Sequence, residues 1–164
     1  MISEALSKYR RIVVVYHWDA DGVCSAALIG KKFRITKFIP CGNEIDAEVT
    51  AAILLENPDC VVIVDIGGLK QEFIDKIKNA AHLIIVDHHT RENEINAEDM
   101  TFIRSQDPIS LVLYHELGGD EWIACAGTRG DKSDDFCKQH FNSDISVCRR
   151  VMGYLNAGKN YMGR

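Results

Sequence analysis

The sequence lacks any apolar run long enough to cross a membrane, since spanning a bilayer takes about 18–20 consecutive apolar residues. Its first segment, Met1–Arg11, also lacks the apolar stretch and the small-residue cleavage site of a secretory signal. We therefore expect a cytoplasmic protein with no membrane partner.

Paired cysteines are missing as well. The six cysteines are scattered along the chain, and no two of them form a Cys-x-x-Cys pair. This spacing disfavours a zinc ribbon or a redox dithiol. We expect the thiols to be small, buried side chains in a reducing compartment.

The chain contains no strongly basic segment. Its formal net charge is −5, and the cation pairs Lys31-Lys32 and Arg149-Arg150 are expected to be solvated surface. Proteins that hold long nucleic acid through its phosphates need a basic face. The composition therefore argues against gripping a long duplex, and it favours a small phosphorylated substrate or the end of a single strand.

What the chain does contain is an alternation of short apolar runs with longer amphipathic stretches. Its 164 residues suit one domain, and neither a repeat nor a Pro/Gly/Ser-rich linker divides them. The expected strands are Ile12–Tyr16, Ile35–Ile39, Cys60–Asp65, His82–Asp87 and a short one at Thr101–Ile103. Helices are expected between the strands and after Pro108. This alternation predicts an α/β fold, with a parallel Rossmann-like sheet of about five strands flanked by helices on both faces.

Three of the apolar runs end in carboxylates or imidazoles. The three clusters are His17-Trp18-Asp19-Ala20-Asp21-Gly22, Asp65, and Asp87-His88-His89. In a parallel sheet the carboxyl ends of the strands share one edge, and ligands bind there. The sequence therefore predicts a functional site at that edge.

The residue types in the first cluster point to a divalent metal. His17, Asp19 and Asp21 have a spacing of two, which on an extended strand end points the side chains the same way. Gly22 then allows a tight turn into a helix. One imidazole with several carboxylates suits Mn²⁺ or Mg²⁺ better than structural zinc. Crowded carboxylates repel one another, and two ions about 3.5–4 Å apart would relieve this and activate water for attack on phosphorus.

A fourth candidate is Gly127-Thr128-Arg129-Gly130-Asp131. We expect Gly130 to let the backbone turn sharply, so that Asp131 points back toward the sheet. A Gly-Asp pair alone is a weak signal, because most such pairs are surface turns. Its weight comes from following the other three clusters in order.

Taken in this order, the clusters resemble the motifs of the DHH phosphoesterase superfamily. That superfamily includes RecJ-like exonucleases, oligoribonucleases, cyclic-dinucleotide phosphodiesterases and family II inorganic pyrophosphatases. The matching motifs are His-Trp-Asp-Ala-Asp-Gly at 17–22, Val-Asp-Ile-Gly at 64–67, Asp-His-His at 87–89 and Gly-Asp at 130–131. The resemblance covers about residues 10 to 160, and Leu155-Asn156-Ala157-Gly158 also resembles a stretch of archaeal RecJ-like proteins.

The resemblance implies two divalent ions, Mn²⁺ by expectation and Mg²⁺ as the alternative. One ion would be bound by His17 and Asp19. The implied ligands of the second ion are Asp21, His88 and Asp131, and Asp65 would bridge the two ions.

The resemblance also implies the catalytic groups. Asp87 would orient a neighbouring imidazole, and His89 would contact the scissile phosphate or protonate the leaving oxygen. Arg91 or Arg129 would steady the phosphate.

Three functions remain open at this point. The first is a RecJ-like, single-strand-specific exonuclease on DNA or RNA ends, with single-stranded nucleic acid or a short oligonucleotide as partner. The second is a phosphoesterase or pyrophosphatase acting on a small substrate. The third is a replication-associated scaffold module without catalysis, which the intact ligand set argues against. Replication or repair proteins would be partners under the first or third.

The resemblance implies a second domain that these residues do not provide. RecJ-like enzymes carry a C-terminal domain in which a Gly-rich segment ending in His grips the substrate, and we find no such segment. We therefore expect residues 1–164 to form the DHH catalytic domain only.

Overall fold

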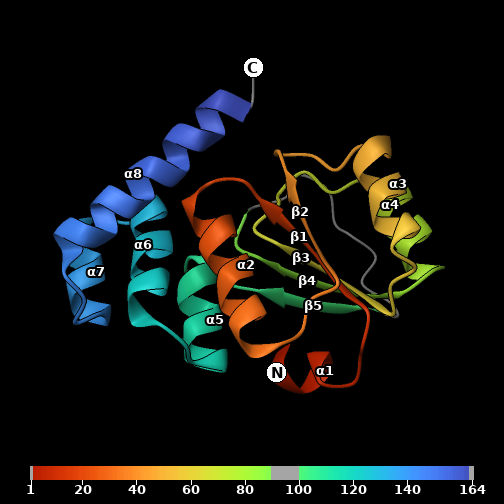
Figure 1. Ribbon diagram of the computed structural model, residues 1–164, viewed down its shortest axis with the longest axis horizontal. Helices are drawn as coiled ribbons and strands as arrows, with labels where there is room; N and C mark the ends of the chain where they lie inside the picture. The colour runs from red at the N-terminus through yellow and green to blue at the C-terminus, as the bar shows by residue number, and fades with distance from the viewer. Residues whose placement is uncertain (1, 90–99, 163–164) are drawn as a thin grey trace.

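A computed structural model of the protein describes residues 2–89 and 100–162. Its centre is one sheet of five parallel strands in the order β2-β1-β3-β4-β5 (Figure 1). The strands are β1 (Ile12–His17), β2 (Lys37–Cys41), β3 (Cys60–Val64), β4 (His82–Asp87) and β5 (Thr101–Arg104). This order is common among doubly wound α/β proteins, and it confirms the predicted fold class.

The three central strands consist almost entirely of Val, Ile and other apolar residues. β1, β3 and β4 are buried along nearly their whole length, as expected for parallel strands covered on both faces. Successive side chains point to opposite faces, so each strand feeds two separate apolar cores. Val14 and Val62 belong to one core, and Val13 and Val61 belong to the other.

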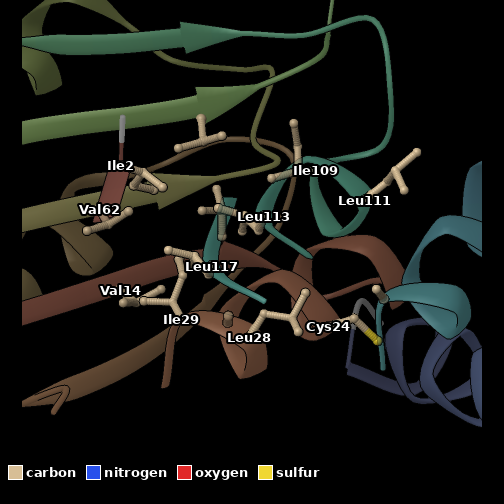
Figure 2. Close-up of a cluster of buried hydrophobic side chains, with 14 of the residues drawn as sticks. Ile2, Val14, Cys24, Leu28, Ile29, Val62, Ile109, Leu111, Leu113 and Leu117 are labelled. Carbon is tan, nitrogen blue, oxygen red and sulfur yellow. The ribbon is translucent and has the colours of Figure 1, made fainter. Parts of the chain in front are cut away.

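Helices from both ends of the chain share the core on the first face. They are α1 (Ile2–Leu6), α2 (Ala20–Lys32), α5 (Ile109–Leu117), α6 (Glu121–Asp131), α7 (Asp134–His140) and α8 (Ile145–Met162). Figure 2 shows part of this core, with Val14 and Val62 of the sheet near Ile29 of α2 and Leu113 of α5. α6 packs against α2 and α5, and α8 packs against α6 (Figure 1). The helical region after Pro108 was predicted, whereas α1 was not.

Two helices cover the second face, namely α3 (Ala47–Leu55) and α4 (Gln71–Lys78) (Figure 1). Ile53 of α3 and Phe73 and Ile77 of α4 are buried against the sheet. The faces matter for the site, because α2 follows β1 over the first face while α4 follows β3 over the second. Adjacent strands whose connections diverge in this way open a crevice at their carboxyl ends, where ligands bind.

The largest difference from the predicted strands is in β2, whereas the ends of β1, β3 and β5 differ by one residue. We expected a strand over Ile35–Ile39 that ended before Pro40, but β2 runs from Lys37 to Cys41 and includes the proline. β2 is an edge strand, so alternate N–H groups have no neighbouring strand to bond. An edge position tolerates a residue that has no N–H.

All six cysteines are buried and free, as predicted. Within the described part of the chain, no helix is both long enough and apolar enough to cross a membrane.

Candidate metal centre

The first cluster spans the turn from β1 into α2. His17 is the last residue of β1, and Asp19 is the N-cap of α2. The Asp19 carboxylate accepts a hydrogen bond from the backbone N–H of Gly22 (3.1 Å) through Oδ1, while Oδ2 lies 2.8 Å from Nδ1 of His17. Our argument from strand alternation was wrong, because of the three side chains only His17 belongs to a strand. Asp19 comes near it because the chain enters the helix within two residues, whereas Asp21 lies with His88 and Asp131.

Gly22 is what makes this turn so tight. A Cβ atom at Gly22 would lie 2.1 Å from the backbone oxygen of His17, which is far inside van der Waals contact. The first turn of α2 therefore lies directly against the end of β1. This confirms the predicted tight turn, although α2 begins at Ala20, before the glycine.

Asp21 is buried and holds the start of another helix. Its carboxylate accepts hydrogen bonds from the backbone N–H groups of Ile109 (2.7 Å) and Ser110 (2.9 Å), and from the Ser110 hydroxyl. These bonds satisfy first-turn donors of α5, which has no side-chain cap of its own. Burial, with the negative charges of Asp65 and Asp131, nevertheless raises the pKa of Asp21 to about 7.

Asp65 lies at the centre of the cluster. It follows β3, is 2% exposed, and has a left-handed backbone with φ of 61°. Its N–H donates to the Val86 carbonyl oxygen (3.0 Å), which fixes the turn. Oδ1 lies 3.0 Å from Nε2 of His88, and Oδ2 lies 3.8 Å from Nδ1 of His17. The two oxygens of one carboxylate thus face the two sides of the cluster.

The Asp87-His88-His89 cluster ends β4. Asp87 is buried, and its Oδ1 lies 2.8 Å from Nδ1 of His89. This contact raises the pKa of His89 and leaves its Nε2 for another partner. The hydrogen bond with Asp65 raises the pKa of His88 to about 9.

Asp131 reaches the cluster from α6. It is the last residue of that helix, and Gly130 is helical too, so our prediction that Gly130 turns the backbone sharply was wrong. A Cβ at Gly130 would lie 3.3 Å from the Cβ of Ala20, so the glycine instead lets α6 approach the start of α2. Asp131 Oδ2 then lies 3.5 Å from Nε2 of His88. Burial, followed by the charge of Asp65, raises the pKa of Asp131.

Among the described residues, no observed contact brings Arg129 into this cluster. Arg129 pairs with Asp134 and donates to the carbonyl oxygen of Lys132 (2.9 Å), which ties the end of α6 to α7. Arg91 lies outside the described residues.

The carboxylates and imidazoles of the cluster fit a divalent ion of the Mn²⁺ or Mg²⁺ type. Ligating atoms within 4.8 Å of one another form three groups among the described residues: His17, Asp19 and Asp65; Asp21, His88 and Asp131; and Asp65, His88 and His89. Carboxylate oxygens with imidazole nitrogens, and no thiolate, are the ligands that such ions take. Burial and, second to it, the charges of neighbouring carboxylates raise the pKa values of Asp21 and Asp131, and bound cations would relieve the repulsion among these carboxylates.

Two residues that support the cluster were not predicted. Ser110 holds Asp21, and Asn156 of α8 accepts a hydrogen bond from the backbone N–H of Ala20 (3.0 Å) through Oδ1. Asn156 belongs to the stretch 155–158 noted for its resemblance, but no local pattern indicates its partner in α2.

Comparison with known proteins gives one family match and several solved structures with a similar fold. Residues 11–124 match the DHH family, N-terminal domain. RecJ from Thermus thermophilus in complex with Mn²⁺ has a TM-score of 0.57 and 22% identity over 79% of this chain. A second structure, exonuclease RecJ bound to manganese, has a TM-score of 0.59 and 21% identity over 79% of this chain. The DHH domain of a member of the S1p family of ribosomal proteins has a TM-score of 0.67 and 16% identity over 99% of this chain.

At these identities the solved structures show a shared fold. The chain spans 23% and 41% of the two RecJ chains and 50% of the third protein. A search of curated proteins found no match.

Proposed function

The chain belongs to the DHH family, and from this premise we propose that it is a metal-dependent phosphodiesterase that removes nucleotides from single-strand ends. One observation carries the proposal: carboxylates and imidazoles from four separate chain segments converge at the crevice between β1 and β3. Such a concentration of buried charge is costly unless it binds something cationic.

The proposed metal ligands divide into two sets around Asp65. One ion would be held by His17 and Asp19, the other by Asp21, His88 and Asp131, and Asp65 would bridge them through its two oxygens. The support is that Oδ1 of Asp65 lies near His88 and Oδ2 faces His17. When bound, two such ions supply charge stabilisation and an activated water for in-line displacement at phosphorus.

His89 is the proposed group for the leaving oxygen or the phosphate. Its ring is partly exposed at the rim of the cluster, whereas Asp87 is buried beneath it. The Asp87 carboxylate holds Nδ1, so Nε2 is the atom that would reach the substrate. Because this pairing raises the pKa of His89, the imidazolium is favoured, which suits donation of a proton to a leaving oxygen.

The proposals for the substrate and for the ion are based on the structures that this chain resembles. The two RecJ structures hold manganese, and one is named an exonuclease, so Mn²⁺ and a nucleic-acid end are the proposals to test first. A CDC45 from Entamoeba histolytica is another structural neighbour, with a TM-score of 0.57 at 14% identity. Replication or repair partners remain a prediction.

The test is hydrolysis of a 5′-labelled single-stranded oligonucleotide with Mn²⁺, compared with the double variant Asp87→Ala/His88→Ala and with inorganic pyrophosphate. We expect mononucleotides from the unmodified protein alone. Phosphate release from pyrophosphate with no cleavage of the oligonucleotide would replace the proposal by the small-substrate alternative. Metal bound without cleavage of either would favour the scaffold alternative.

A further inference from the structure

A pocket of about 240 Å³ opens next to the metal centre. It lies between the ends of β1 and β2, the first turns of α2 and the second half of α8. Three aromatic residues, three aliphatic ones and one glycine line it: Tyr16, Trp18, Tyr154, Val23, Pro40, Leu155 and Gly158. None of these side chains is charged. The volume is below that of a pocket for a drug-sized ligand, and it suits a single ring system.

The indole of Trp18 is held in place on one side of this pocket. The backbone N–H of Trp18 donates to the carbonyl oxygen of Cys41 (3.1 Å), and the indole ring lies so close to Gly42 that a Cβ there would be 3.2 Å from it. Trp18 also stands between His17 and Asp19 in the chain. The pocket and two of the proposed metal ligands therefore share one short segment of the chain.

The opposite wall is held by α8. The Asn156 side chain bonds the N–H of Ala20, which fixes this part of α8 to the start of α2. Tyr154, two residues earlier, is 78% exposed. A large aromatic residue thus remains accessible on a helix whose position relative to the metal ligands is fixed.

We propose that this pocket binds the nucleobase of the nucleotide whose phosphate lies at the metal centre, with the rings of Trp18 and Tyr154 as its walls. The inference rests on the proposed function and adds to it a binding site for the base of the nucleotide that is removed. Stacking on aromatic rings accepts every base, because each base has a π-face. An uncharged pocket has no group to pair with a second phosphate, so it gives no advantage to pyrophosphate.

The experiment measures binding by fluorescence. The chain has two tryptophans, so Trp122→Phe leaves Trp18 as the only reporter. The ligand is a single-stranded tetranucleotide with hydrolysis-resistant phosphorothioate linkages, and its control is the same backbone without bases. We expect the base-bearing strand to quench Trp18, and Tyr154→Ala to weaken its binding about 5- to 100-fold. Tyr154→Phe keeps the ring and should restore binding.

The matched control is Val147→Ala, which removes an exposed apolar side chain at the other end of α8. Equal binding of the two strands, or equal affinities of Tyr154→Ala and Val147→Ala, would overturn the inference. Mn²⁺ titration of the same variants tests the proposed function separately. Failure to bind Mn²⁺ contradicts that function, whereas base-independent binding to a Mn²⁺-loaded protein contradicts only the pocket.

Discussion

Asp65 combines two demands in one residue. Its carboxylate is buried between two groups of ligating atoms, and its backbone is left-handed at φ 61°. Left-handed backbone costs most residues about 1–2 kcal/mol, and Asp and Asn tolerate it best because their short polar side chains bond locally. Charge and conformation can therefore be separated by substitution.

Asp65→Asn keeps the conformation and removes the charge. We expect it to abolish hydrolysis and lower the Mn²⁺ content per chain while leaving the free energy of unfolding within about 1 kcal/mol of the unmodified protein. Asp65→Ala should lose metal equally and also lose about 1–2 kcal/mol of stability from backbone strain. Elemental analysis and urea unfolding measure the two effects. Full Mn²⁺ content with most activity in Asp65→Asn would refute the bridging role.

His89 is predicted to act on the substrate rather than on the metal. His89→Ala should slow turnover about 10²- to 10⁴-fold, the usual contribution of a positioned acid or base, with the Mn²⁺ content unchanged. His115→Ala, which alters an exposed histidine of α5, is the control and should leave turnover unchanged. Loss of Mn²⁺ from His89→Ala would instead make His89 a metal ligand, consistent with its place near Asp65.

At the scale of elements, the contact between β1 and α2 sets the geometry of the first cluster. Gly22 lets the helix start against the carbonyl of His17, and Asp19 caps that same helix. A side chain at Gly22 would meet backbone, which cannot move aside as a flexible side chain can.

Gly22→Ala should therefore destabilise the fold by about 1–3 kcal/mol and weaken Mn²⁺ binding, because His17 and Asp19 would separate. Gly153→Ala is the matched control, since that helical glycine of α8 has open space around it. Ala has the higher helix propensity, so Gly153→Ala should be neutral or stabilise by up to about 1 kcal/mol. Thermal unfolding of both variants checks this, and equal melting temperatures would contradict the close approach.

The sequence predicts those elements whose signal is local. Apolar runs mark β1, β3 and β4, and the polar residues that follow them mark the edge where the cluster lies. The position of α6 depends instead on packing, because Gly130 is a contact point with Ala20 and looks like a turn residue only when read in sequence. The partners of Ser110 and Asn156 are also distant in sequence, at 89 and 136 residues along the chain, so no local pattern indicates them.

At the scale of the whole molecule, the ionisation of the cluster is coupled to folding. Folding raises the pKa of Asp21 from 3.8 to about 7 and that of His88 from 6.5 to about 9. In both cases the folded state binds more protons than the unfolded state, so stability falls as pH rises. For Asp21 the loss is complete above about pH 7, and for His88 it continues to about pH 9.

We expect the melting temperature in EDTA to fall between pH 6.5 and pH 9, the interval in which His88 keeps its proton in the folded state but loses it in the unfolded state. With Mn²⁺ the trend should reverse, because ligands must be deprotonated to bind metal and binding stabilises the folded state. Circular dichroism melts across this interval measure both trends. Asp21→Asn removes one titrating group, so the melting temperature in EDTA should fall less steeply at the low-pH end of this interval. A metal-free melting temperature that rises with pH would contradict the coupling.

The close approach of α6 to α2 also bears on how the protein is made. Five of the six proposed ligands have left the ribosome once His88 has emerged, but Asp131 and the α5 amides that hold Asp21 follow only later in synthesis. A nascent chain halted between His88 and Asp131 would carry an incomplete set of the proposed metal ligands. Acquisition of the full metal complement is then a late event of biogenesis, and it coincides with the docking of the C-terminal helices.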